Sequence, residues 1–244
     1  MSTTDDGVPL DGTRREIYEY VRREGRTTES DLRAALDLDK TALGHHLTVL
    51  RRHGYLWQSD DEIAVGFGEA SPESHETDGI EYEVRLARAP DRDGLIETIR
   101  AVAAAGRYIE AESVADVLEE GGAVLRRDPV NSRLVFVARV EGNGVAGWVH
   151  LDIPELEKLR HTAVLTVGVH PDWRDHGIGG TLLERGEQWA REHGYERLYN
   201  SIPATNDRAI DWLAARGWHE EAVREGHYRI DGDPVDEVMM ATDL

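Results

Sequence analysis

The residues best suited to chemistry lie in a short glycine-rich segment in the C-terminal half of the chain. An apolar run over 163–169 is followed by Arg174 and then by Gly177, Gly179 and Gly180. Glycine lets main-chain N–H groups approach a ligand closely, and an amphipathic stretch directly afterwards predicts a helix. Because the unpaired amides and the positive end of a helix favour an anion, this segment predicts a site for a group such as a pyrophosphate.

A second segment downstream has a similar organisation. Residues 196–202 predict a strand, a turn follows, and Asn206 is suited to be the N-cap of a helix over 207–216 that ends at Gly217. The remaining expected elements of this half are strands at 81–88, 134–140, 145–151, 219–230 and 235–243 and helices at 91–105 and 111–121.

Both segments resemble motifs of the GNAT superfamily of N-acetyltransferases. The first, Arg174-x-x-Gly177-x-Gly179-Gly180, is similar to the acyl-CoA-binding motif, and Asn206-x-x-Ala209 is similar to the start of the second motif. Over 81–244 the resemblance implies an α/β (α+β) GNAT fold, in which helices flank a mixed central sheet. It implies acetyl-CoA as the co-substrate and a primary amine, on a protein or a small molecule, as the acceptor.

The resemblance also implies which residues contact the coenzyme. Main-chain N–H groups around Val167–Val169 would polarise the thioester carbonyl, and Gly168 is expected to mark a bulge that splays this strand from the next. The complete set of expected acetyl-CoA contacts is Val167, Gly168, Val169, Arg174, Asp175, His176, Gly177, Ile178, Gly179, Gly180 and Asn206.

The resemblance does not supply a catalytic acid or base. Many members of the family carry a Tyr seven residues after the motif Asn, and relatives that modify ribosomal-protein N-termini carry a Glu five residues before it. These positions hold Leu213 and Ser201, neither of which titrates near neutrality. The other residues that could serve as the catalytic acid or base are His150, His161, Tyr199 and Tyr228. Two functions therefore stay open: an N-acetyltransferase, or a transcription regulator that senses acyl-CoA with little or no turnover.

The N-terminal part reads as a compact helical module. Helices are expected over 13–24, from Thr28 onward and over 39–53, followed by a short hairpin at 55–57 and 63–65. This order resembles a winged helix-turn-helix of the MarR/ArsR type, with 39–53 as the recognition helix. Leu43, Leu47 and Leu50 would face inward. The residues expected to contact double-stranded DNA are Lys40, Thr41, Gly44, His45, Thr48 and Arg52.

The role of this module stays open between DNA binding and protein interaction or dimerisation. A palindromic DNA site would require a homodimer. The tip of the wing is acidic at Asp60, Asp61 and Glu62, which disfavours phosphate contacts unless salt screens the charge. No metal site is expected, because the adjacent His45 and His46 would point about 100° apart on a helix.

Composition and charge set the context. The chain holds 48 acidic against 28 basic residues, a net charge of −20, and its only lysines are Lys40 and Lys158. Such an acidic, lysine-poor surface resembles proteins of salt-accumulating haloarchaea, where high salt screens the self-repulsion. Absence of cysteine excludes disulfides and thiolate catalysis. No signal peptide or membrane span is expected, and the predicted location is the cytoplasm.

We expect four regions along the chain: a disordered tail at 1–10, the winged helix-turn-helix at 11–66, an acidic linker at 67–80 and the GNAT-like domain at 81–244. The linker is inferred from its polar composition and its lack of apolar periodicity.

Overall fold

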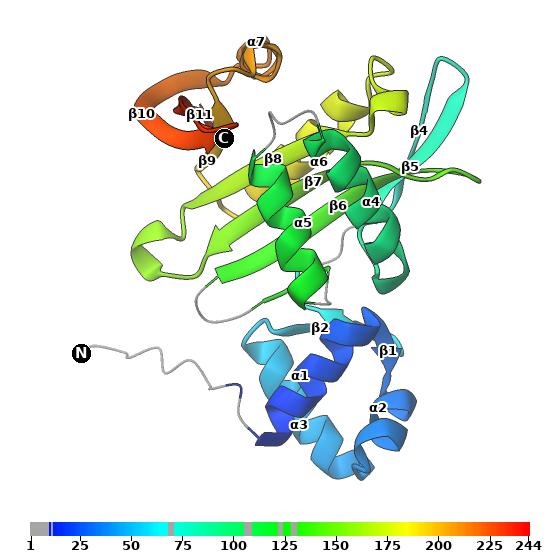
Figure 1. The fold of residues 1–244 in the computed structure, drawn as a ribbon. Helices are drawn as coiled ribbons and strands as arrows, with labels where there is room; N and C mark the ends of the chain where they lie inside the picture. Colours follow the sequence, from blue (N-terminus) through cyan, green and yellow to red (C-terminus); the bar gives the residue numbers. More distant parts are fainter. Residues whose placement is uncertain (1–9, 11, 68–70, 105–108, 122–123, 128–130) are drawn as a thin grey trace.

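The structure, a computed structural model, places a small helical unit against the end of a large sheet (Figure 1). The residues it describes are 10, 12–67, 71–104, 109–121, 124–127 and 131–244. All but the last residue of the expected tail over 1–10 therefore lie outside the described part of the chain. Within that part, no helix combines the length and the apolarity needed to cross a membrane.

Three helices and a three-stranded sheet form the N-terminal unit, which confirms the expected fold. The elements are α1 (Gly12–Glu24), β1 (Arg26–Thr28), α2 (Glu29–Leu36), α3 (Lys40–Arg52), β2 (Leu56–Ser59) and β3 (Glu62–Val65). The strand order is β1-β3-β2. The sequence did not predict β1, because three residues are too few to show an alternating pattern.

Local signals explain where these helices begin. Thr28 caps α2 and Asp39 caps α3, and each side chain accepts a hydrogen bond from a main-chain N–H in the first turn. Leu43, Leu47 and Leu50 of α3 are almost fully buried, as expected, and pack into the core with residues of α1 and β3. The opposite face of α3 is therefore left toward solvent.

An eight-stranded mixed sheet forms the C-terminal part. Its strands are β4 (Glu73–Thr77), β5 (Ile80–Leu86), β6 (Asn131–Val140), β7 (Gly144–Pro154), β8 (Thr162–Val169), β9 (Arg197–Pro203), β10 (His219–Ile230) and β11 (Asp233–Asp243). Their order is β10-β11-β9-β8-β7-β6-β5-β4. Among the described strands only β8 and β9 pair in parallel.

Helices cover both faces of this sheet (Figure 1). The helices are α4 (Arg92–Ala103), α5 (Ile109–Gly121), α6 (Ile178–Glu192) and α7 (Asp207–Ala214), with short 3₁₀ turns at Ala89–Asp91, Glu157–Leu159 and Pro171–Trp173. The fully buried Trp148 lies in the core under α4 and α5, and the fully buried Phe136 lies in the core under α6. The two faces of the sheet thus carry separate apolar layers.

The expected acidic linker over 67–80 is wrong in two places. Phe67 is buried, and Glu73–Thr77 form β4, which pairs with β5 at the edge of the sheet. An edge strand needs only main-chain hydrogen bonds on one side, so its side chains can be polar on both faces. The contact between Glu73 and Arg185 of α6, 3.2 Å apart, adds an ion pair that no periodicity reveals.

Hydrogen bonds join the N-terminal unit to the sheet. The Tyr18 hydroxyl accepts from the Arg127 main-chain N–H at 2.6 Å, and Arg127 Nη1 donates to the Gly66 carbonyl at 2.7 Å. Trp189 Nε1 of α6 donates to the Phe67 carbonyl at 3.2 Å. Because these contacts combine with a continuous apolar core, the N-terminal unit packs directly onto the sheet and α6.

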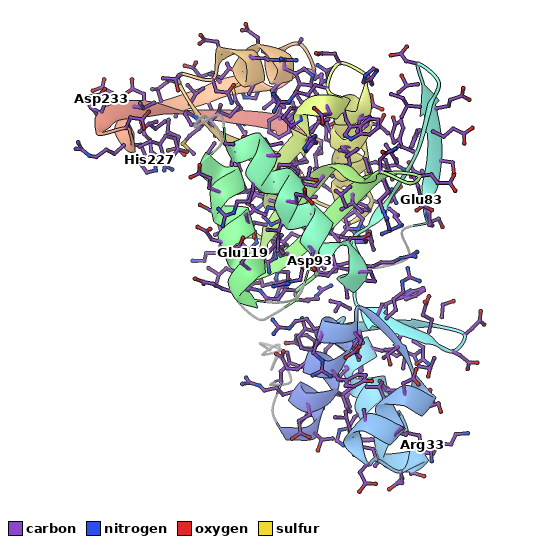
Figure 2. All side chains as sticks on the ribbon, turned by 45° about the vertical axis from the view of Figure 1, so that its right-hand side comes forward. Arg33, Glu83, Asp93, Glu119, His227 and Asp233 are labelled. Carbon is purple, nitrogen blue, oxygen red and sulfur yellow. The ribbon has the colours of Figure 1, made fainter. Side chains whose placement is uncertain are left out.

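Acidic side chains cover much of the exterior. Figure 2 shows Glu83, Asp93, Glu119 and Asp233 projecting outward from four different elements. Asp93, Glu119 and Asp233 are exposed and Glu83 is partly exposed, which is consistent with the net charge of −20.

Candidate functional site: a pocket between two splayed strands

The pocket arises where the two parallel strands separate. β8 and β9 pair only through Thr162–Val164 and Arg197–Tyr199. Beyond that point Asn200 Nδ2 donates to the Leu165 carbonyl at 2.6 Å, so a side chain replaces the ladder hydrogen bond that the diverging strands no longer make. The gap between the strands is thus stabilised by the buried side chain of Asn200.

Main-chain groups of β8 face this gap. The Leu165 carbonyl accepts from Asn200, and the Val169 carbonyl accepts from Arg174 Nε at 3.1 Å. Main-chain groups of alternate residues in a strand point to the same side. The N–H and C=O of Val167, which lies between these two positions, therefore point into the gap as well.

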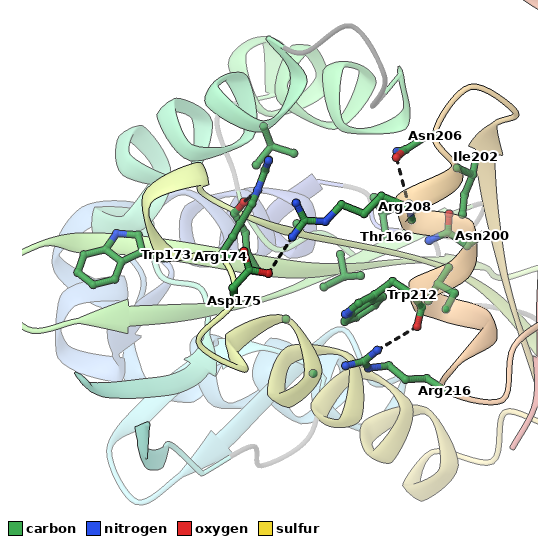
Figure 3. Close-up of a pocket in the computed structure, with 18 of the residues that line it drawn as sticks. Thr166, Trp173, Arg174, Asp175, Asn200, Ile202, Asn206, Arg208, Trp212 and Arg216 are labelled. Atoms are coloured by element: carbon green, nitrogen blue, oxygen red, sulfur yellow. Dashed lines mark hydrogen bonds and ion pairs between the residues drawn. The ribbon is translucent and has the colours of Figure 1, made fainter. Parts of the chain in front are cut away.

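A cavity of about 450 Å³ occupies the gap between the two strands. Its lining includes Val102 of α4 on one face and Trp212 of α7 on the other, with Thr166 and Ile202 from the separated strands between them (Figure 3). Side chains from both faces of the sheet thus contribute to the lining of the cavity.

The start of α6 forms one wall of the cavity. Gly177 has φ +77°, a left-handed conformation suited to glycine, and the helix begins directly after it. A Cβ at Gly179 would lie 3.4 Å from the Trp212 ring, so the absence of a side chain leaves the space between the helix start and this ring open. By helix geometry the N–H groups of Ile178 and Gly179 have no partner within the helix and are available to an anion.

Guanidinium groups surround this helix start. Arg208 Nη2 lies 2.8 Å from Asp175 Oδ1, and the Arg216 guanidinium stacks over the Trp212 ring at 4.0 Å (Figure 3). Together with Arg174 they place three cations around one end of the pocket, in a chain that is strongly acidic overall. This arrangement favours a polyanionic ligand such as a diphosphate.

Most of the expected coenzyme contacts line this pocket. They are Val167, Gly168, Val169, Arg174, Asp175, Gly177, Gly179, Gly180 and Asn206. His176 and Ile178 lie outside the lining: His176 Nδ1 is 3.2 Å from Asp78 Oδ2, and the Ile178 side chain is buried in the core. Asn206 also caps α7, as expected, by accepting from the Ala209 N–H.

The expected role of Gly168 needs a correction. Gly168 pairs in regular register with Trp148 of β7, so it does not form a bulge there. A Cβ at this position would collide with the Trp148 ring. The glycine is therefore required because the indole crosses the strand, and the splay begins earlier, beyond Val164.

Sequence reasoning did not predict several lining residues of α7. Arg208, Trp212 and Arg216 lie at i, i+4 and i+8 and so share one side of the helix and its C-terminal extension. That spacing was a detectable signal, although nothing local indicated that this side faces a cavity.

The four candidate acid or base residues lie outside the pocket lining. His161 is exposed at the start of β8, at the opposite end of that strand from the pocket. Tyr199 lies beneath the Arg197 guanidinium, and the Tyr228 hydroxyl donates to Glu237 at 3.4 Å. The structure thus places these three residues outside the lining of the pocket, and their expected roles as acid or base stay predictions.

His150, the fourth candidate, is buried between α4–α5 and the sheet. Burial lowers the pKa of His150 to about 4, and its Nε2 lies 3.6 Å from Asp152 Oδ2. It is therefore a neutral core side chain near pH 7. Leu213 and Ser201 do line the pocket, so the two positions where related enzymes carry an acid and a base face the cavity without titratable groups.

The expected DNA-contacting residues share the outer face of α3. Those with exposed side chains are Lys40, Thr41, His45, Thr48 and Arg52, and Gly44 between them is partly exposed. Arg51 Nη1 donates to Gln58 of the wing at 3.0 Å, which ties the helix to the hairpin. No group of three or more potential metal-ligating side chains occurs among the described residues.

Together, the mixed sheet, the splayed parallel strands and the glycine-rich helix start define a class of acyl-CoA-binding α/β domains. Comparison with known families agrees: residues 103–218 match the acetyltransferase (GNAT) family model, and residues 10–54 match a helix-turn-helix domain model. The chain therefore contains a GNAT acetyltransferase domain preceded by a helix-turn-helix domain. The family uses acetyl-CoA.

Individual relatives are distant. An uncharacterized N-acetyltransferase of Methanocaldococcus jannaschii is 30% identical over 98 residues, which cover 39% of this chain and 43% of the relative. The [ribosomal protein bS18]-alanine N-acetyltransferase of Escherichia coli K12 is 26% identical over 83 residues, which cover 34% of this chain and 56% of the relative. The chain thus spans about half the length of the curated relatives it matches.

A solved structure extends the likeness in fold. The spermidine N-acetyltransferase of Vibrio cholerae, in complex with CoA and spermine, superposes with a TM-score of 0.53 at 16% identity. The match covers 66% of this chain and 95% of that structure. At this level of identity the likeness shows the shared fold.

Proposed function

We propose that the protein is an acetyl-CoA-dependent N-acetyltransferase that moves an acetyl group to a primary amine. The observation that carries the proposal is the cavity between β8 and β9, into which the main chain of Val167 points beside the amides and arginines at the start of α6. The same region matches the GNAT family model.

Each reactant has a place in this arrangement. The amides of Ile178 and Gly179, with Arg174, Arg208 and Arg216, would hold the diphosphate. The Val167 N–H would donate to the thioester oxygen and stabilise the negative charge that develops on it, an effect worth about 100- to 1,000-fold in rate for one donor. The amine enters from the opposite face of the sheet, attacks the carbonyl carbon, and the CoA thiolate leaves.

The acceptor is proposed as a class, a primary amine on a protein lysine, a protein N-terminus or a small molecule. Two of the proteins named above are, by name, a ribosomal-protein alanine N-acetyltransferase and a spermidine N-acetyltransferase, and both of these acceptors carry primary amines. Amines of these kinds are largely protonated at neutral pH, lysine most of all. The enzyme therefore needs a group that accepts a cation and its proton on the acceptor side of the gap.

A transfer assay tests the proposal. Radiolabelled acetyl-CoA is incubated with spermidine, a lysine-containing peptide and a peptide that begins with alanine, in about 2 M KCl to screen the acidic surface. We expect label to move to at least one acceptor. No transfer to any acceptor, with CoA bound, would overturn the enzymatic proposal.

A second function has specific support in Leu213 and Ser201, which face the pocket without titratable groups, and in the exposed outer face of α3. In this alternative the chain is a DNA-binding regulator whose GNAT domain senses acyl-CoA. Genomic fragments selected by the protein with and without acetyl-CoA distinguish the two. Acetyl-CoA-dependent DNA binding without transfer would favour the regulator, and transfer without sequence-selective DNA binding would favour the enzyme.

A further inference from the structure

A buried carboxylate lies beside the pocket on the sheet face that α4 and α5 cover. Glu237 of β11 is only 2% exposed, and Asp91 is the other buried carboxylate among the described residues. Asp91 is held by Arg85 in a hydrogen-bonded ion pair at 2.6 and 2.9 Å and so has a structural role. Burying a carboxylate costs free energy unless it is paired, so Glu237 calls for an explanation.

Strand register places Glu237 next to residues that line the pocket. Glu237 is opposite Pro203 in the β9–β11 ladder, and Ser201 is its diagonal neighbour on the same face. Diagonal neighbours lie about 7–8 Å apart, within reach of a long side chain. Ser201, Ile202 and Pro203 all line the pocket, and Ile202 also belongs to the core that contains residues of α6.

Hydrogen-bonding groups of β10 surround the carboxylate. The Tyr228 hydroxyl donates to Oε1 at 3.4 Å. Oε2 lies 3.0 Å from Arg224 Nη1 and 3.5 Å from His227 Nε2, yet it accepts no hydrogen bond of acceptable geometry. Figure 2 shows His227 on the hairpin arm formed by β10 and β11.

Glu237 Oε2 thus forms an ion pair with the guanidinium of Arg224, but the geometry of this contact is not that of a hydrogen bond. The Arg224 side chain is 52% exposed and can swing into solvent. An ammonium group that entered from this face would find a buried oxygen with unused acceptor capacity, which favours a cation. His227 is 43% exposed and connects the same oxygen to solvent.

We propose, on the basis of the proposed function, that Glu237 receives the ammonium group of the acceptor and that His227 takes its proton. The ammonium gives one proton to neutral His227, and the freed lone pair on nitrogen forms the C–N bond with the acetyl carbon. The C–S bond breaks with its electron pair on sulfur, and the nitrogen loses its second proton to solvent as the amide forms. The CoA thiolate takes a proton from solvent, and His227 releases its proton to water. This assignment supplies the acid–base group that Ser201 and Leu213 lack.

Glu237→Gln tests the assignment, since it removes the charge and keeps the shape. We expect kcat/KM for the best acceptor among spermidine, a lysine peptide and an alanine-initiated peptide to fall about 100-fold or more, with the Kd for CoA within about twofold of wild type. Glu225→Gln is the matched control, because it removes an exposed carboxylate from the same hairpin. A Glu237→Gln enzyme that keeps more than about a third of the wild-type kcat/KM would overturn the proposal.

Arg224→Gln separates an amine site from a structural ion pair. If Glu237 only pairs with Arg224, both variants lose thermal stability and activity alike, which would contradict the proposal. If Glu237 binds the amine, Arg224→Gln removes a competing cation and lowers KM for the acceptor.

Calorimetry keeps the assignment testable even if the wild-type protein transfers no acetyl group. Spermidine is titrated into the CoA-saturated protein. Binding that Glu237→Gln abolishes supports the site, and binding that the variant retains, or its absence in the wild type, contradicts it. Failure of wild-type transfer alone counts against the proposed function instead.

Discussion

Replacing Gly179 with aspartate would place a carboxylate where the coenzyme diphosphate is expected. A Cβ at this position would lie 3.4 Å from the Trp212 ring and from Val169 Cγ2, which is ordinary contact. Gly179 is in the first turn of α6 and does not have a positive φ. The side chain can therefore be accommodated, and its charge is the main change.

The size of the effect follows from Coulomb's law. Two unit charges about 4 Å apart at an effective dielectric constant of about 20 interact by about 4 kcal/mol. Even if high salt and exposure halve this repulsion, about 2 kcal/mol corresponds to about a 30-fold rise in Kd. An acidic residue in the first turn of a helix stabilises the helix by about 0.3–1 kcal/mol, so Tm should not fall.

Isothermal titration calorimetry with CoA in about 2 M KCl measures the change. Gly179→Asn is the matched control, since asparagine fills the same space without the charge. We expect Gly179→Asp to bind CoA at least about 10-fold more weakly than Gly179→Asn. Equal affinity of the two variants would refute the idea that the start of α6 holds an anion.

Three further predictions concern stability. Between pH 6.5 and about 4 the unfolded chain binds a proton at His150 that the folded protein excludes, so the free energy of unfolding decreases as the pH is lowered through this range. His150→Leu should reduce this pH dependence in urea titrations, and an unchanged pH dependence contradicts the assignment. Gly168→Ala, whose methyl group meets Trp148, should cost about 1–3 kcal/mol in thermal unfolding; an unchanged Tm counts against that contact. The acidic surface predicts that helical circular dichroism present in about 2 M KCl declines in about 50 mM salt, and an equal signal in both would exclude a halophilic adaptation.

The sequence predicted those features whose signals are local. The Thr28 cap, the leucine spacing of α3 and the glycines after β8 act within a few residues of themselves, so their consequences can be read along the chain. The nine lining residues predicted from the two motifs could be predicted for the same reason, because eight of them lie between the end of β8 and the first turn of α6 and the ninth, Asn206, caps α7.

Features that depend on distant partners escaped prediction. β4 is polar because it pairs on one side only, and its register with β5 appears only in the folded sheet. Glu237 lies near the pocket because it pairs in the β9–β11 ladder with Pro203, which is more than thirty residues away in the sequence. His161 and Tyr199 were plausible strand residues, but only the fold shows that neither side chain lines the pocket.

The most direct test of the account is a crystal structure of the protein with bound acetyl-CoA. We predict that diphosphate oxygens lie within about 3 Å of the Ile178 and Gly179 amides and that the thioester oxygen accepts a hydrogen bond from the Val167 N–H. A coenzyme bound outside the gap between β8 and β9, or a thioester turned away from Val167, would contradict it.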